Sequence, residues 1–392
     1  MTASIFRMAL QKQRGLVMPL VAISMISLIA MAGLVMDLGH LYLNKTRLQN
    51  AADAAALSAA QTLDVTHKIL LANAAGKHTF NNAINQELVD ANLRPIFTYS
   101  EKIQPFIDTT DTAQHPVFVR VVVSGFSQKN FLLPIIGINT LLASATAVAG
   151  PSLGLNKVCN AVPLVACGDS DSALNNFGFV PDKVYSLKTG TDINDNWGVT
   201  KNGTYQNIQL DCGTSDDYDC IGKQVAGQYA QCLTIGDTIN TVPPDDFSAN
   251  SDGINTRLDC PEESCGAFGS DDNYPSDKVT VYPYTMTNYQ ADYTTQNFSR
   301  TGIQYKELRR IIVMPVVDCS TTTNGSGNLL ILGLGCFFLT EPSGNDANGQ
   351  QTIYAQYLEN CLARGKMGVD PILKSGPHTI ILYRDITGNL DS

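Results

Sequence analysis

The chain has 392 residues, of which 44% are hydrophobic and only 16% charged, and its formal net charge is −10. This composition argues against a disordered acidic chain and against a protein with many membrane spans, and the length suits two or three domains. An isoelectric point near 4.9 argues against a nucleic-acid partner, because such proteins normally present a basic face. Residues 1–50 carry five Lys or Arg and one Asp, so the acidic charge lies in the rest of the chain.

The first clear structural pattern is an apolar stretch from Gly15 to Met36, which contains no charged residue. A hydrocarbon core about 30 Å thick needs about 20 helical residues, so this stretch is long enough to span a membrane. Basic residues and no acids precede it, which predicts a cytoplasmic N-terminus and places the rest of the chain outside. A cleaved secretory signal is the alternative, but its apolar region is shorter, about 7–15 residues. We therefore expect a retained anchor.

The helical pattern continues beyond the apolar stretch. Apolar residues recur at spacings of three, four and seven residues from Leu34 to Ala52, and seven of residues 51–60 are Ala. Pro19 is tolerated if it lies in the first turn. We predict one helix over residues 19–63, about 67 Å long, whose part beyond the membrane is a stalk. The Ala-rich surface of this stalk suits packing on its own domain or on another molecule.

The middle segment, residues 64–150, is expected to form a small α+β module. Helical spacing continues over residues 66–90, and strands are predicted over residues 97–107, 115–126 and 140–149. A further apolar run occupies residues 131–138. Gly150 and Pro151 mark a boundary, after which we expect a separate domain over residues 151–392.

All ten cysteines lie in this third segment. An even number of cysteines beyond a membrane span predicts disulfides formed in an oxidising compartment. The sequence does not assign the pairing, although Cys212–Cys220 and Cys260–Cys265 are candidate local pairs. A zinc site is the alternative, but only the Cys260–Cys265 spacing approaches that of zinc ligands and no His lies near it. The candidate disulfide cysteines are Cys159, Cys167, Cys212, Cys220, Cys232, Cys260, Cys265, Cys319, Cys336 and Cys361.

The third segment is predicted to be a mixed α/β domain. Buried strands are expected over residues 310–317, 328–339 and 379–383, with a helix over residues 351–364 between the last two. The overall prediction is an α+β fold in three parts. These parts are a basic tip, transmembrane helix and stalk (residues 1–63), a helix-on-sheet module (residues 64–150) and a cysteine-rich domain (residues 151–392).

The sequence contains none of the common catalytic motifs, such as G-x-S-x-G, H-E-x-x-H or a P-loop. Asp318, Ser320 and Thr322 are weak metal candidates, because they follow a hydrophobic strand and resemble the D-x-S-x-S loop of von Willebrand A domains. A Cys inside this loop and the final Thr depart from that pattern. The Asp-rich runs 192–196 and 216–219 lack the Gly and Glu of a calcium loop. We therefore predict no enzyme, no cofactor, no metal and no small-molecule substrate.

A long motif in the N-terminal segment carries a family resemblance. It reads G-L-V-M-D-L-G-H-L-Y over residues 33–42 and L-Q-N-A-A-D-A-A-A-L over residues 48–57. It resembles the N-terminal region of TadG-like proteins of the tight-adherence (Flp) pilus assembly family. Later stretches, among them residues 252–259 and 309–319, are more loosely similar. The family-motif residues are Gly15, Gly33, Asp37, Gly39, Tyr42, Leu48, Gln49, Asn50, Ala52 and Asp53.

The resemblance implies a bitopic bacterial inner-membrane protein with a pilin-like module, whose C-terminal domains are periplasmic or associated with the pilus. It implies anchoring or scaffolding through non-covalent contacts with pilus assembly proteins or minor pilins. Prepilin signals carry a Glu at the fifth mature position, and Leu20 stands there if cleavage follows Gly15, so we favour an uncleaved anchor. The alternative is a surface or pilus-tip adhesin with a degenerate, metal-binding von Willebrand A-like domain.

Overall fold

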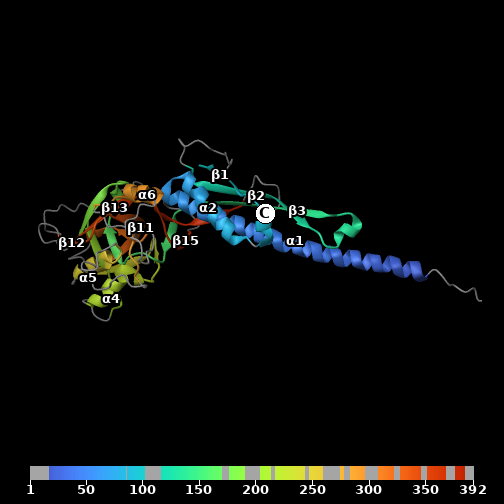
Figure 1. Cartoon of the computed structure of the whole chain (residues 1–392). Helices are drawn as coiled ribbons and strands as arrows, with labels where there is room; N and C mark the ends of the chain where they lie inside the picture. The colour runs from blue at the N-terminus through green and yellow to red at the C-terminus, as the bar shows by residue number, and fades with distance from the viewer. Residues whose placement is uncertain are drawn as a thin grey trace, which may run out of the picture. The chain divides into compact units, whose positions relative to one another are not determined.

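The computed structural model describes most of the chain and divides it into two compact units (Figure 1). Unit 1 comprises Met1–Ala59, Ala72–Ala149 and Leu382–Ser392, and unit 2 comprises Ala60–Leu71 and Gly150–Ile381. The described residues are 17–84, 86–101, 116–169, 176–189, 204–212, 217–242, 247–258, 274–277, 283–295, 308–321, 327–345, 351–367 and 376–384.

The N-terminal segment forms one long helix, α1 (Val17–Thr66, 50 residues), which confirms the helix predicted from the apolar spacing. Its uninterrupted course reflects the Ala-rich sequence and the position of Pro19 in the first turn, where a missing N–H removes no helical hydrogen bond. Among the described residues, α1 is the one helix long and apolar enough to cross a membrane. The large apolar side chains between Val17 and Met36 are all exposed, as a lipid-facing surface requires.

Two shorter helices and a four-stranded sheet complete unit 1 (Figure 1). The helices are α2 (Ile69–Ala83), which belongs to this unit from Ala72 onward, and α3 (Gln86–Asp90). The sheet has the order β1-β2-β3-β17, and both β1–β2 and β2–β3 are antiparallel. Its strands are β1 (Ile96–Ser100), β2 (Phe118–Lys129), β3 (Thr140–Pro151) and β17 (Ile380–Tyr383), of which β3 belongs to unit 1 up to Ala149 and β17 from Leu382 onward.

The β2–β3 hairpin is the part of this sheet that matters for the site. Its last ladder pair joins Lys129 to Thr140, and the turn between them contains the short 3-10 helix η1 (Leu133–Ile136). Gly137 ends η1 with a φ of 87°, a conformation that favours glycine. The apolar run noted in the sequence at residues 131–138 therefore forms the hairpin turn. Residues 102–107 of the first predicted strand lie outside the described residues.

Unit 2 is built on an eight-stranded sheet with the order β12-β13-β6-β7-β5-β10-β11-β9. Two additional pairings, β13–β11 and β7–β9, close this sheet on itself. Most neighbours are antiparallel, but β10–β5 and β6–β7 are parallel. The strands are β5 (Leu164–Cys167), β6 (Val184–Thr189), β7 (Thr204–Ile208), β9 (Thr238–Val242), β10 (Ile311–Val317), β11 (Gly327–Leu339), β12 (Gly344–Asn345) and β13 (Gln351–Leu358).

Short elements surround this sheet. A three-stranded sheet has the order β15-β4-β8, and β14 pairs with β16 in parallel. The short strands are β4 (Leu155–Val158), β8 (Leu233–Thr234), β14 (Asn360–Leu362), β15 (Gly365–Met367) and β16 (Gly376–His378). The helical elements are α4 (Tyr218–Lys223), the π-helical η3 (Gln224–Gln228), α5 (Phe247–Asn255), α6 (Met286–Thr295) and η4 (Cys319–Thr321).

The strand β10 and the second half of β11, from Gly333 onward, are buried on both faces and divide the core of unit 2 into two clusters. Val313 and Phe338 belong to one cluster, whereas Met314 and Phe337 belong to the other. Successive residues of a strand point to opposite faces, so continuous apolar runs such as these fill both sides of the sheet. The strands predicted over residues 310–317 and 328–339 are thereby confirmed.

Four disulfides stabilise the described part of unit 2. They include the local pair Cys212–Cys220, which the sequence suggested, and the more widely separated pair Cys336–Cys361. Cys260 and Cys265 lie outside the described residues. The remaining bridges are Cys159–Cys232 and Cys167–Cys319.

The helix predicted over residues 351–364 is wrong. The segment forms β13 and then β14, and β13 pairs with β6 on one side and with β11 on the other. Residues such as Ala355, Gln356 and Leu358 favour helices in isolation, but Ile353 and Tyr357 favour strands. A position between two strands supplies backbone partners on both edges, and this tertiary context overrides the local preference.

Candidate functional site

The candidate site is the buried face of α1 together with the β2–β3 turn. We call this face the α1 seam: Gly33, Asp37, Asn44 and Leu48, followed by Gln49, Ala52 and Asp53. Intervals of four, seven and four residues keep the first four on one side of a helix with 3.6 residues per turn. The seam contains six of the ten family-motif residues, so the motif marks a packing surface inside unit 1.

Asp37 lies at the centre of the contact between the α1 seam and the turn. Its side chain is fully buried, and its carboxylate accepts three backbone hydrogen bonds. The amide of Phe131 donates to Oδ1 at 2.9 Å, and the amides of Leu132 and Leu133 donate to Oδ2 at 3.0 and 2.9 Å. These donors compensate the buried charge, and they are the N–H groups at the start of η1. Asp37 therefore caps η1 from a different element.

Gly33 allows α1 to approach the turn closely. A Cβ atom at this position would lie 2.6 Å from the Cβ of Leu132, a distance that real Cβ atoms do not reach. On the other side of Asp37, the side-chain Nε2 of Gln128 donates to the backbone carbonyl of Asp37 at 3.2 Å. The side-chain Nδ2 of Asn44 donates in turn to Gln128 Oε1 at 3.3 Å. The turn and the end of β2 are thus fixed to α1 over about three helical turns.

The second half of the α1 seam is small and closely packed. Ala52 and its neighbours Ala51, Ala55 and Ala56 are fully buried, which reflects the absence of bulky side chains on this face. Gln49 donates to Asp53 Oδ1 at 2.8 Å and to the carbonyl of Thr146 in β3 at 2.9 Å. Burial raises the pKa of Asp53, and the hydrogen bond from Gln49 opposes this rise.

The helix α2 packs against the part of α1 that directly follows the seam. A Cβ atom at Gly76 would lie 3.1 Å from the carbonyl oxygen of Ala55, and Thr79 donates to the Ser58 hydroxyl at 2.9 Å. The Ala-rich surface is therefore used, at least in part, for packing on its own domain. This is one of the two uses that the sequence left open.

Three family-motif residues point away from unit 1. A Cβ atom at Gly39 would meet no described atom within 4 Å, and the side chain of Tyr42 is 71% exposed. Asn50 is exposed as well, and Leu38 adds an exposed apolar side chain next to Gly39. Packing inside unit 1 does not explain these residues, so they form a surface available to another molecule. Gly15 lies outside the described residues.

Sequence reasoning missed the partners of Asp37. The turn residues 131–133 and Gln128 lie more than 90 positions from Asp37 in the sequence, and helical spacing says nothing about such contacts. One signal was present: residues 130–149 contain no charged residue. Asn44 was also missed, although it falls on the same helical face as Gly33 and Asp37.

The weak metal candidates are not gathered around an ion site in the described residues. Asp318 Oδ1 accepts the amide of Ser320 at 2.9 Å, and Cys319 between them is bonded to Cys167. Thr322 lies outside the described residues. No group of three or more His, Cys, Asp or Glu side chains suited to a metal occurs in the described parts of the chain.

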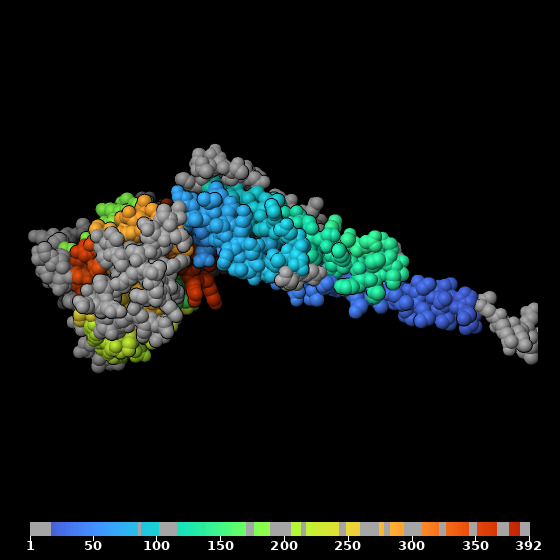
Figure 2. Space-filling view, viewed as in Figure 1, coloured from blue at the N-terminus to red at the C-terminus, as the bar shows by residue number. Residues whose placement is uncertain are grey.

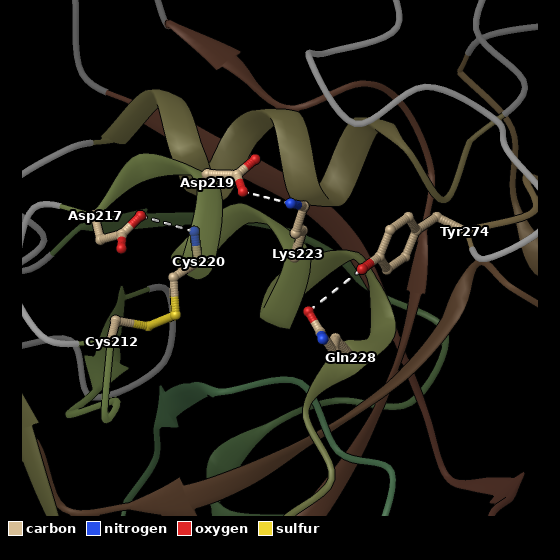
Figure 3. Close-up of polar contacts among 7 residues, drawn as sticks. All are labelled: Cys212, Asp217, Asp219, Cys220, Lys223, Gln228 and Tyr274. Carbon is tan, nitrogen blue, oxygen red and sulfur yellow. Dashed lines mark hydrogen bonds and ion pairs between the residues drawn. A yellow bond between two sulfur atoms is a disulfide. The ribbon is translucent and has the colours of Figure 1, made fainter.

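The acidic run before α4 is also used within the protein (Figure 3). Asp217 caps α4 by accepting the amide of Cys220 at 3.0 Å, and Asp219 forms an ion pair with Lys223. Nearby, the Tyr274 hydroxyl donates to the side chain of Gln228 at 3.3 Å. The two carboxylates thus serve different local partners instead of converging, as calcium ligands would.

Two of the later family-like stretches, residues 252–259 and 309–319, meet in unit 2. Arg257 donates to the carbonyl of Val225 at 2.9 Å, and Arg309 donates to the carbonyl of the next residue, Ala226. Burial lowers the pKa of Arg257, and the charge of Arg309 lowers it further. These arginines tie η3 to the rest of the unit.

Beside this pair lies the fully buried Asp277. It accepts the hydroxyl of Tyr289 at 3.1 Å and the amide of Arg310 at 3.2 Å. The side chain of Arg310 is buried too, with its guanidinium 5.2 Å from the ring centroid of Tyr284. A buried carboxylate with hydroxyl and amide donors and arginines nearby is a structural network, and it holds no nucleophile paired with a base.

The comparison with protein families identifies the N-terminal segment. Residues 15–62 match the family described as putative Flp pilus-assembly TadE/G-like, which confirms the resemblance drawn from the motif. The match covers the apolar segment and the whole α1 seam. No significant match was found among curated proteins or among solved structures.

Proposed function

We propose, from the premise that residues 15–62 form a TadE/G-like Flp pilus-assembly segment, that the protein is a bitopic inner-membrane component of Flp pilus assembly. It anchors or scaffolds by non-covalent contacts with pilins, minor pilins or other assembly proteins, and it is not an enzyme. The observation that carries this proposal is the family match on a helix whose first twenty residues expose their large apolar side chains.

Charge and cysteine usage support one orientation. Arg7, Lys12 and Arg14 precede the apolar segment, which favours a cytoplasmic N-terminus. The disulfides of unit 2 favour an oxidising compartment such as the periplasm for the rest of the chain. Residues 1–63 then act as anchor and stalk, residues 64–150 as a pilin-like module and residues 151–392 as a periplasmic domain.

The division of the motif into buried and exposed residues supports a contact with other assembly components. Gly33 and Asp37 build unit 1, whereas Leu38, Gly39 and Tyr42 face outward just beyond the apolar segment. We propose this outward face as the contact with an assembly partner. The alternative, an adhesin with a metal at Asp318, has less support, because Asp318 already accepts a hydrogen bond inside its own loop.

Photo-crosslinking in pilus-forming cells tests this proposal. A crosslinking amino acid at Tyr42 should give adducts with pilus assembly proteins or minor pilins, identified by mass spectrometry. The same amino acid at Leu70, which is 80% exposed on α2, is the matched control and should give few such adducts. Equal adducts at both positions, or none at Tyr42 in piliated cells, would contradict the proposed contact.

Topology needs a separate measurement. Reporter fusions at the C-terminal end should be active in the periplasm and inactive in the cytoplasm. A cytoplasmic C-terminal end would overturn the orientation, although it would leave the family assignment of residues 15–62 in place.

A further inference from the structure

The end of the β2–β3 hairpin exposes large apolar side chains. We call residues 130–139 the hairpin tip. Within it, the side chains of Phe131, Ile135 and Ile138 are 74%, 61% and 42% exposed, and Leu142 in the adjoining strand is 75% exposed. The tip has no charged residue. Exposed apolar groups concentrated at one place on a protein mark a contact surface.

The hairpin tip lies at the boundary of the apolar segment of α1. It is hydrogen-bonded to Asp37, the first charged residue after that segment, and it contacts Gly33 one turn earlier. Residues 17–36 are about 30 Å long as a helix, the thickness of a hydrocarbon core. Figure 2 shows that α1 continues beyond the hairpin as a single helix toward its N-terminus. The exposed apolar surface of the tip is therefore continuous with that of the membrane segment.

The backbone of the tip is suited to a medium without water. An irregular turn is normally excluded from lipid, because its N–H groups would lack acceptors. Here Asp37 accepts three of them, and Pro134 has no N–H to satisfy. The amides of Asn130, Ile135, Gly137 and Ile138 donate to carbonyls within the tip, at distances of 3.0 to 3.2 Å. A fully buried carboxylate thus removes the main obstacle to placing this turn in lipid.

We infer that the hairpin tip inserts into the lipid bilayer, in the leaflet on the Asp37 side, beside the helix that spans it. Phe131 and Ile135 enter the acyl region, and Lys129 at the base of the hairpin is exposed and reaches the phosphate groups. The protein then contacts the membrane at two places, the α1 span and the tip. This inference rests on the proposed membrane span.

Depth-dependent quenching by lipids with brominated acyl chains tests the insertion. The chain has one tryptophan, Trp197, so a Trp197→Phe background allows a single reporter at a chosen position. The full-length protein in vesicles would carry Phe131→Trp as the test variant. Met31→Trp, in the apolar segment, reports on the span itself.

The matched control is Ile96→Trp. Ile96 is 58% exposed in the same sheet and pairs with Val122, seven residues from Lys129, so it lies about 23 Å from the hairpin base. We expect brominated lipids to quench the fluorescence of Phe131→Trp almost as much as that of Met31→Trp. The fluorescence of Ile96→Trp should be the same in vesicles with and without brominated lipids.

Each outcome separates the inference from its premise. If Met31→Trp is quenched but Phe131→Trp behaves like Ile96→Trp, the span is real and the tip inference is overturned. A blue-shifted but unquenched Phe131→Trp also overturns it and assigns the tip to a protein partner or a second copy. If Met31→Trp itself is unquenched, the membrane span is wrong and the inference fails with it.

Discussion

Unit 1 contains no cysteine, whereas unit 2 contains all ten. In unit 1, small residues let α1 approach the sheet and α2, and Asp37 fixes the hairpin turn through backbone groups. In unit 2, disulfides and a buried network of arginines around Asp277 connect segments that are distant in the sequence. The comparison teaches that unit 1 depends on close packing, whereas unit 2 depends on covalent and charged links.

The largest effect is expected from the buried network of unit 2. Asp277→Ala removes the acceptor of Tyr289 and Arg310 and leaves arginine charge uncompensated, so it should reduce the free energy of unfolding by about 3–5 kcal/mol. Urea unfolding of the full chain in detergent, monitored by near-ultraviolet circular dichroism, measures this change in the free energy of unfolding. Asp219→Ala is the control and should have little effect, because its ion pair with Lys223 is exposed.

The second prediction concerns the disulfides. Replacing Cys336 and Cys361 by Ala should destabilise unit 2 by about 3.5 kcal/mol, because the bridge closes a separation of 25 residues. Removing Cys212–Cys220, with a separation of 8, should cost less, about 2.5 kcal/mol. In both variants, hydrogen exchange of the β2 and β3 amides in unit 1 should not change. Faster exchange there would show that the two units are not independent in stability.

The third prediction sharpens the role of Asp37. Asp37→Asn replaces an acceptor oxygen by a donor group, so at least one amide among residues 131–133 loses its partner. Exchange of these amides, measured by mass spectrometry, should become roughly tenfold faster or more. Asn50→Ala on the exposed face of α1 should leave it unchanged. Unchanged exchange in Asp37→Asn would contradict the capping of η1.

The fourth prediction compares two glycines of α1, and Gly39 should give the smallest effect. Gly33→Ala places a Cβ atom against Leu132, so the turn must shift at a cost of about 1–3 kcal/mol. Gly39→Ala meets open space and should stabilise the helix by about 0.5–1 kcal/mol. Thermal unfolding of both variants in detergent compares them. Similar melting temperatures would mean that the contact at Gly33 adapts without strain.

The helix α1 could be predicted from the sequence, because helical spacing is a local signal. Leu34, Leu48 and Ala52 carry it without reference to any other segment. The strands β10 and β11 were also predictable, because runs such as Ile311–Val317 are apolar at every position.

The rest of the fold and of the site depends on contacts between residues that are far apart in the sequence. Gln351–Leu358 contains residues that suit a helix, and only pairing with β6 and β11 makes it a strand. The motif identified Asp37, but its partners Phe131–Leu133 follow from the length and register of the β2–β3 hairpin. Three disulfides were likewise beyond sequence reasoning, because their cysteines lie 25 to 152 residues apart.

The strand β17 has a consequence for biosynthesis. It is the neighbour of β3 in the sheet of unit 1, yet the chain from Gly150 to Ile381 is assigned to unit 2. A ribosome therefore makes nearly all of unit 2 before β3 receives its last partner. During that interval the outer edge of β3 offers unpaired N–H and C=O groups to any other nascent strand. A stop codon placed before Ile380 would leave that edge open permanently, and such a truncated product should aggregate.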